Sequence, residues 1–122
     1  MVMLKLASSP MNSRNIFLFH KTTHRDAYEQ ARNDVDNCDD VILWNEKNEL
    51  TETTVANLFL EIDGELVTPP VECGLLAGTY RRHMIENGKV KEAIVRKSDL
   101  VKVTKIYVAN SVNGLVEARL VQ

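Results

Sequence analysis

The chain has 122 residues, of which 44% are hydrophobic and 26% are charged, a balance that fits one globular domain and leaves no room for two cores. Its formal net charge of −2 gives no basic field for a polyanion, so nucleic-acid binding is not expected. No stretch approaches the roughly 20 apolar residues of a membrane span, and the first residues have too short an apolar core for a secretory signal. We therefore expect a cytoplasmic protein with neither a membrane nor a nucleic acid as partner.

Most of the strands are predicted from short apolar runs that lie between turn signals. The predicted strands are residues 16–19, 41–44, 50–54, 56–62, 65–68, 90–96, 106–109 and 115–121. Between two of them, Asp63-Gly64 tolerates positive φ and predicts a tight type I′ turn. Pro69 and Pro70 remove two amide donors in succession, so a loop is expected from there to Gly78.

Two helices and one short helical turn complete the predicted elements. The first helix is expected over residues 24–34, where Tyr28 and two alanines recur at helical spacing. The second is expected over residues 79–86 and should end at Asn87-Gly88, because glycine readily supplies the left-handed C-terminal conformation. The turn opens at Ser98. Several hairpins with few short helices indicate an α+β fold rather than a parallel doubly wound sheet.

The two cysteines and three histidines indicate no redox or metal site. Cys38 and Cys73 form no CxxC pair, so both are expected to be free thiols, with Cys73 a small core residue. His20, His24 and His83 show no regular ligand spacing, and we therefore predict no metal site.

Lys21 is the first candidate for chemistry. If the strand over residues 16–19 continues, then Phe17, Phe19 and Lys21 point to the same face, which would draw the ammonium toward an apolar environment. Desolvation lowers the pKa of a lysine and makes its neutral, nucleophilic amine accessible. The simpler alternative is a solvated surface lysine.

Three further candidates are each weak when taken alone. Glu52 lies in a strand-like segment that is poor in charge, although a glutamate on a solvated strand face is the simpler interpretation. Residues 78–81 open a predicted helix, where free amides and the helix dipole favour an anion such as phosphate. Ser111 follows a predicted strand and by itself is a turn serine.

The order of these segments resembles the pattern of class-IV aminotransferases and aminodeoxychorismate lyases, the fold-type-IV enzymes that depend on pyridoxal 5'-phosphate (PLP). The resemblance extends from about residue 14 to the Ala109-Asn110-Ser111 segment. It is carried by the segments Phe19-His20-Lys21-Thr22-Thr23-His24-Arg25, Thr51-Glu52-Thr53-Thr54-Val55-Ala56-Asn57-Leu58-Phe59, Thr68-Pro69-Pro70 and Gly74-Leu75-Leu76-Ala77-Gly78-Thr79-Tyr80-Arg81. It implies a mixed or antiparallel sheet that forms a pseudo-barrel with short helices.

The same resemblance implies roles for individual residues. Lys21 would be the catalytic lysine that forms the Schiff base with PLP and moves a proton at the substrate carbon. Glu52 would pair with the pyridine nitrogen, because a carboxylate there keeps the nitrogen protonated and the ring able to accept electrons. Asn57 would support the site structurally rather than bind the cofactor. The cofactor-binding residues implied in this way are Lys21, Glu52, Leu76, Thr79, Tyr80 and Ser111, the last three of which would hold the phosphate.

The segment around Lys21, with Arg25 and Tyr28, looks more like aminodeoxychorismate lyases than branched-chain aminotransferases. The implied reaction takes a small amino substrate, 4-amino-4-deoxychorismate, to 4-aminobenzoate and pyruvate, a step toward folate. The alternative is a class-IV aminotransferase for branched-chain or D-amino acids, which passes the amino group to a keto acid.

The resemblance also bears on the domain organisation. Residues 1–122 are expected to form one domain similar to the C-terminal PLP-binding domain, while the smaller N-terminal domain of the family is not in this sequence. That domain would contribute a phosphate-binding arginine, and neither Arg14 nor Arg25 matches its position. A third hypothesis is therefore an inactive cofactor-binding or interaction module. A homodimer, or a complementing N-terminal domain, is the expected partner.

Overall fold

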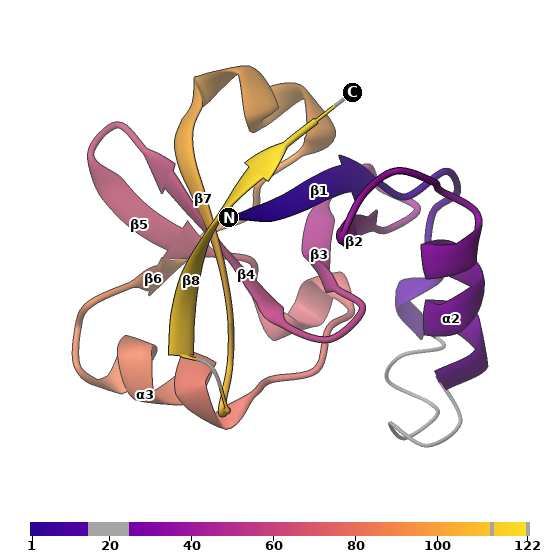
Figure 1. The fold of residues 1–122 in the computed structure, drawn as a ribbon. Helices are drawn as coiled ribbons and strands as arrows, with labels where there is room; N and C mark the ends of the chain where they lie inside the picture. The colour runs from indigo at the N-terminus through magenta and orange to yellow at the C-terminus, as the bar shows by residue number, and fades with distance from the viewer. Residues whose placement is uncertain (15–24, 113, 122) are drawn as a thin grey trace.

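The computed structural model describes residues 1–14, 25–112 and 114–121, and its strands close into a barrel (Figure 1). The ring runs in the order β3-β2-β1-β8-β7-β4 and closes where β3 pairs with β4. Its strands are β1 (Val2–Leu6), β2 (Asp40–Trp44), β3 (Leu50–Thr53), β4 (Asn57–Ile62), β7 (Val103–Asn110) and β8 (Gly114–Leu120). Two shorter strands, β5 (Glu65–Thr68) and β6 (Lys91–Glu92), extend the sheet from the second half of β4. The predicted α+β fold with a mixed-sheet pseudo-barrel is confirmed.

Strand β1 was not predicted, although it is central to closing the barrel. It lies between β2 and β8 and pairs with both in parallel. The β5–β6 pairing is also parallel, and the remaining pairings between the described strands are antiparallel. Parallel neighbours need long connections, so the sequence next to β1 gives no hairpin signal that would reveal it.

The strand predicted over residues 90–96 is wrong in its extent. Only Lys91 and Glu92 pair with β5. The Ala93 amide still donates to the Thr68 carbonyl of β5 at 3.0 Å, and the backbone then crosses to β3, where the Leu50 amide donates a hydrogen bond of 2.7 Å to the Val95 carbonyl. The strand predicted over residues 16–19 lies outside the described residues.

The apolar runs are explained by burial on both faces of the barrel wall. Ile42 of β2 belongs to the core cluster that fills the barrel, whereas Val41 and Leu43 face outward and pack with Tyr28 of helix α2 (Arg25–Asn33). A strand covered on both faces has an apolar run in place of an alternating pattern. The barrel core consists of Leu4, Ile42, Leu50, Leu58, Leu60, Val67, Val95, Ile106, Val108 and Ala118.

The helices lie outside the barrel, with α2 beside it and α3 (Thr79–Glu86) at the end where β7 turns into β8 (Figure 1). Both agree with the predicted helices to within a residue at each end. After α3, Gly88 has a φ of 69°, as expected of a glycine that ends a helix. The loop predicted after Pro70 contains a short 3-10 helix, η1 (Val71–Cys73), and a second one, η2 (Lys97–Lys102), contains the helical turn predicted at residue 98.

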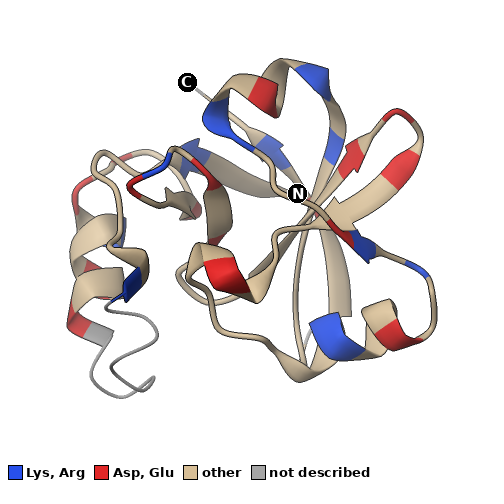
Figure 2. Ribbon diagram, turned by 180° about the vertical axis from the view of Figure 1, so that it is seen from behind, with Lys and Arg blue, Asp and Glu red and all other residues tan. Residues whose placement is uncertain are grey.

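The structure also shows the predicted Asp63-Gly64 turn, the distribution of charged residues and the character of the helices. Asp63 and Gly64 have φ values of 53° and 79°, which confirms a turn with two positive φ angles. Over the described part of the chain, Lys and Arg are interspersed with Asp and Glu around the ribbon (Figure 2). None of the helices in that part is both long and apolar enough to cross a membrane.

Candidate functional site

A β-bulge in β3 determines where Glu52 points. Ile42 of β2 pairs with Thr53, and Trp44 pairs with Leu50. Strand β3 therefore has one residue more than β2 between the two pairs. In a regular strand Glu52 would share a face with Leu50, whose side chain belongs to the barrel core. The extra residue re-aims the side chain, and Glu52 faces away from the barrel interior.

The Glu52 carboxylate is buried, with 4% of the residue exposed, and two donors contact it. The hydroxyl of Tyr28 on α2 donates to Oε2 at 2.6 Å, and the amide of Leu76 donates to Oε1 at 3.4 Å. None of the ion pairs formed by the described residues includes Glu52. Burial raises the pKa of Glu52 to about 7, against the hydrogen bonds from Tyr28 and Leu76, which lower it. A cation placed beside this carboxyl would therefore convert it to the charged form near neutral pH.

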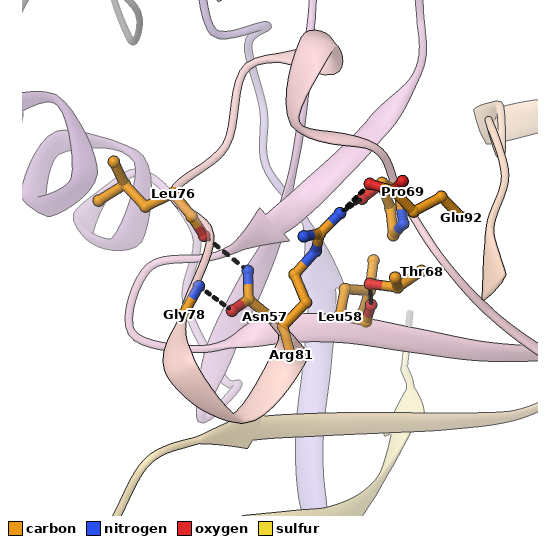
Figure 3. Close-up of polar contacts among 8 residues, drawn as sticks. All are labelled: Asn57, Leu58, Thr68, Pro69, Leu76, Gly78, Arg81 and Glu92. Atoms are coloured by element: carbon orange, nitrogen blue, oxygen red, sulfur yellow. Dashed lines mark hydrogen bonds and ion pairs between the residues drawn. The ribbon is translucent and has the colours of Figure 1, made fainter. Parts of the chain in front are cut away.

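Asn57 connects the loop before α3 to the strand beside Glu52 (Figure 3). Its Nδ2 donates to the Leu76 carbonyl at 2.8 Å, and the Gly78 amide donates to its Oδ1 at 3.0 Å. Asn57 is also the register partner of Glu52 in the β3–β4 pairing. The two hydrogen bonds therefore hold the loop against β4, next to the residue of β3 that carries the carboxylate.

The N-terminus of α3 has amides without an intrahelical acceptor. Gly78 is the N-cap and has no side chain to cap the helix, so the amides of Thr79 and Tyr80 remain available to an anion. The helix itself is fixed by Arg81, which is buried and donates to the Pro69 carbonyl at 3.0 Å and to Glu92 at 2.6 Å (Figure 3). The start of the helix is thus a rigid place for a negative group.

Gly78 cannot gain a side chain without disturbing this arrangement. A Cβ on Gly78 would lie 2.6 Å from Oδ1 of Asn57, while its φ of −75° is acceptable to alanine, so the conflict is purely steric. We expect Gly78→Ala to lower the free energy of unfolding by about 1–3 kcal/mol, measured by urea denaturation. In an Asn57→Ala background the clashing atom is gone, and Gly78→Ala should then cost little. Equal losses in both backgrounds would contradict the steric explanation.

These groups meet at one cavity of about 420 Å³, within the range of small-molecule sites. Of the predicted site residues, Glu52, Leu76, Thr79 and Ser111 line it. They come from β3, from the loop before α3, from α3 itself and from the turn after β7. The structure therefore brings together residues that lie up to 59 positions apart, from Glu52 to Ser111.

Two predicted site residues stand apart from that group. The ring of Tyr80 packs against Phe59 on the outer face of the barrel, with ring centroids 6.5 Å apart, so its backbone amide is the part that can act at the site. Lys21 lies outside the described residues, and its role stays a prediction.

Sequence reasoning missed the contact between Tyr28 and the site. The helical spacing identified Tyr28 only as a residue on the buried face of a helix. Since a buried tyrosine hydroxyl usually has a hydrogen-bond partner, the sequence held a signal that some acceptor faces α2. It held no signal that the acceptor is Glu52, which comes 24 residues later.

Comparison with known proteins connects this geometry to a family. The sequence profile of the family "Amino-transferase class IV" matches residues 3–121. The chain belongs to the class-IV aminotransferase family. The match begins well before residue 14 and therefore includes residues 3–6 of β1.

Individual relatives cover nearly the whole chain. A protein from Schizosaccharomyces pombe, provisionally named aminodeoxychorismate lyase, is 30% identical over 115 residues, which are 88% of this chain and 50% of that protein. The structure of a provisionally named amino-acid aminotransferase from Mesorhizobium loti is 39% identical with a TM-score of 0.91, covering 99% of this chain and 60% of the other. The chain spans about half or less of the length of the curated relatives it matches.

A second structure shows the same fold in complex with a derivative of the cofactor. The branched-chain aminotransferase of T.th., bound to N-(5'-phosphopyridoxyl)-L-glutamate, is 14% identical with a TM-score of 0.80, covering 98% of this chain and 43% of the other. Class-IV aminotransferases and aminodeoxychorismate lyases depend on PLP.

The residues of this structure fit such a cofactor. The buried Glu52 has no cationic partner among the described residues and would gain one from a protonated pyridine nitrogen. The uncapped start of α3 offers amides to a phosphate, next to the Ser111 turn. Both features line the same cavity, so one molecule with a basic ring nitrogen and a phosphate could satisfy both.

Proposed function

We propose that this chain is the cofactor-binding part of a PLP-dependent lyase that converts 4-amino-4-deoxychorismate to 4-aminobenzoate and pyruvate. The observation that carries the proposal is the buried carboxylate of Glu52 in a cavity that also contains the amide-rich start of α3. The lyase reaction is supported by the residues around Lys21 and by the S. pombe relative. Its substrate is a small amino compound. A homodimer or a complementing N-terminal domain is part of the proposal.

In the proposed site each residue has a defined role. Glu52 holds the proton on the ring nitrogen, and the amides of Thr79 and Tyr80, with the hydroxyl of Ser111, bind the phosphate. Lys21 anchors the cofactor covalently and moves a proton at the substrate carbon. When bound, PLP supplies an electron sink for the bonds that change.

A second candidate function, an amino-acid aminotransferase, is favoured by the higher identity to the M. loti protein. The two reactions differ in what they need and release. A lyase releases pyruvate from 4-amino-4-deoxychorismate without a keto acid, whereas an aminotransferase requires a keto acid to accept the amino group. Pyruvate release with no keto acid added would support the lyase, and amino transfer to 2-oxoglutarate without pyruvate release would support the alternative.

Cofactor attachment is the first experiment for the proposal. After unbound PLP is removed by gel filtration, we expect the 122-residue chain to keep a near-visible absorbance band that is absent from Lys21→Ala, because only the wild-type lysine can anchor the cofactor covalently. Borohydride reduction and mass analysis of peptides should then locate the cofactor on Lys21.

Lys47→Ala is the matched control, because Lys47 lies outside the cavity lined by Glu52. It should label as efficiently as the wild type. If wild type and Lys21→Ala are equally colourless and unlabelled, the chain does not hold PLP unaided, and the proposal fails for this chain.

A further inference from the structure

The shortest hydrogen bond to the Glu52 carboxylate comes from helix α2 rather than from the loop before α3. Tyr28 of α2 is buried, with 4% of its surface exposed, and its hydroxyl donates to Oε2 of Glu52 at 2.6 Å. The Leu76 amide donates to the other oxygen, Oε1, at the longer distance of 3.4 Å. A hydrogen bond to an ionised acceptor at 2.6 Å lies in the range of charge-assisted bonds, which are about twice as strong as neutral ones. Tyr28 is therefore the main constraint on the rotation of this carboxylate.

The ring and the hydroxyl of Tyr28 do different things. The ring packs in a cluster with Ala7, Val41 and Leu43, between α2 and the outer face of β2. A phenylalanine would fill that space as well as a tyrosine. The hydroxyl adds nothing to this packing, and its bond reaches instead into the cavity.

The carboxylate keeps acceptor capacity for a ligand after both bonds are made. Each carboxylate oxygen can accept two hydrogen bonds, and the structure gives one to each oxygen of Glu52. With both oxygens held, the free lone pairs have a fixed direction. A ring N–H that enters the cavity then meets an acceptor that needs no reorganisation.

We infer that Tyr28 is a positioning residue that holds the Glu52 carboxylate in the orientation in which it receives the ring nitrogen of the cofactor. The inference rests on the proposed function for the identity of that ligand. It goes beyond it by assigning to the hydroxyl of a helix residue a role that no predicted site residue has.

Within the described part of the chain, Tyr28 is the side chain that most directly affects the ionisation of Glu52. Among the described residues that line the cavity, Tyr28 and Glu52 are the titratable ones. The neighbouring cavity contains the further charged groups Glu29, Arg32, Asp39 and Asp40. Of these, Arg32 donates to the backbone carbonyls of residues 35 and 38, and Asp40 accepts from the Thr54 hydroxyl. These contacts turn both side chains to partners other than Glu52.

The first test uses the protein without cofactor. The ionisation of Glu52 is followed by carboxyl ¹³C NMR of the full chain, with the signal assigned by its loss in Glu52→Gln. Because the Tyr28 hydroxyl stabilises the charged form, Tyr28→Phe should move the titration of Glu52 to higher pH by about one unit. Tyr107→Phe, in β7 and outside the cavity, is the matched control and should leave the titration unchanged. An unchanged titration in Tyr28→Phe would overturn the inference.

The second test asks whether Tyr28 acts through Glu52. We expect Tyr28→Phe to weaken PLP binding about tenfold in the wild type and to have no further effect in Glu52→Gln, since the carboxylate to be positioned is then gone. A merely structural role for the hydroxyl predicts the same loss in both backgrounds, and that result would also overturn the inference.

A failure of this inference can be distinguished from a failure of the proposed function. If the chain binds no PLP, the cofactor-free titration still decides whether Tyr28 controls the carboxylate. Should Tyr28→Phe not fold, 3-fluorotyrosine placed at position 28 gives the opposite perturbation in a folded protein. Its more acidic hydroxyl is a stronger donor, so the titration of Glu52 should move to lower pH, and no movement would count against the inference.

Discussion

Glu52→Gln is expected to slow pyruvate formation by the PLP-loaded protein about a hundred-fold or more while leaving the fold intact. Glutamine keeps the size of the side chain and can accept from Tyr28, but it cannot hold a positive charge on the ring nitrogen. Loss of a preorganised electrostatic partner of this kind typically reduces turnover by about 10²–10³-fold. The measurement is pyruvate release under saturating substrate, with cofactor occupancy checked by absorbance.

The same substitution should stabilise the protein when no cofactor is bound. Burial raises the pKa of Glu52 in the folded state to about 7 from an ordinary value of 4.5, so the folded protein holds this proton more tightly than the unfolded chain does. Stability from this group is therefore present below about pH 4.5 and is lost as the pH rises to about 7. The loss is on the order of 3 kcal/mol.

Glutamine is uncharged, like the protonated carboxyl of Glu52. The difference in stability between Glu52→Gln and the wild type should therefore depend on pH. Glu52→Gln should match the wild type in urea denaturation near pH 4.5 and exceed it at about pH 8. Glu61→Gln, on β4 and outside the cavity, is the control and should change neither activity nor this pH dependence. A variant that keeps full turnover, or one that is less stable than the wild type at the higher pH, would contradict the role assigned to Glu52.

Asn57→Ala is expected to lower the free energy of unfolding by about 2–4 kcal/mol and to weaken PLP binding. The change removes both Nδ2 and Oδ1 of the Asn57 side chain. The Leu76 carbonyl and the Gly78 amide therefore lose the hydrogen bonds of 2.8 and 3.0 Å that they make to Asn57. Each partly buried group left without a partner costs about 1–3 kcal/mol. The loop before α3 is then free to move away from Glu52.

The control for Asn57→Ala is a substitution that loses the same kind of bond elsewhere. The Thr68 hydroxyl is buried and donates to the Leu58 carbonyl at 2.7 Å, away from the cavity (Figure 3). Thr68→Val should therefore reduce stability while leaving PLP affinity as in the wild type. If Asn57→Ala lowers stability but binds PLP normally at a temperature where it is folded, Asn57 does not position the site.

Hairpins and helix ends could be predicted from the sequence because their signals are local. The type I′ turn at Asp63-Gly64 and the glycine stop after α3 depend on the backbone preferences of one or two residues. Strand β1 and the crossing of residues 94–96 to β3 could not be predicted in this way. Both are decided by partners far away in the chain, such as Asp40 for Leu4 and Leu50 for Val95.

The candidate site was predicted from the resemblance, and its physical basis became visible only in the fold. From the sequence alone, a solvated strand face was the simpler interpretation of Glu52. Its burial depends on a bulge that changes the side-chain face and on a helix that supplies Tyr28. Neither feature has a signature in the residues next to Glu52, because both arise from how β2 and α2 pack against β3.

The position of β1 has a consequence for how the chain folds. Its register joins Val2 to Ala118, so two segments far apart in the sequence must meet before the ring of strands is complete. Contacts with such a large sequence separation carry a high loop-closure cost and slow folding. During synthesis on the ribosome, β2 and β3 can pair early, but β1 lacks one of its two neighbours until residues 114–120 have emerged. The nascent chain therefore exposes an unpaired edge of β1 until β8 has been synthesised, a period in which a chaperone could bind it.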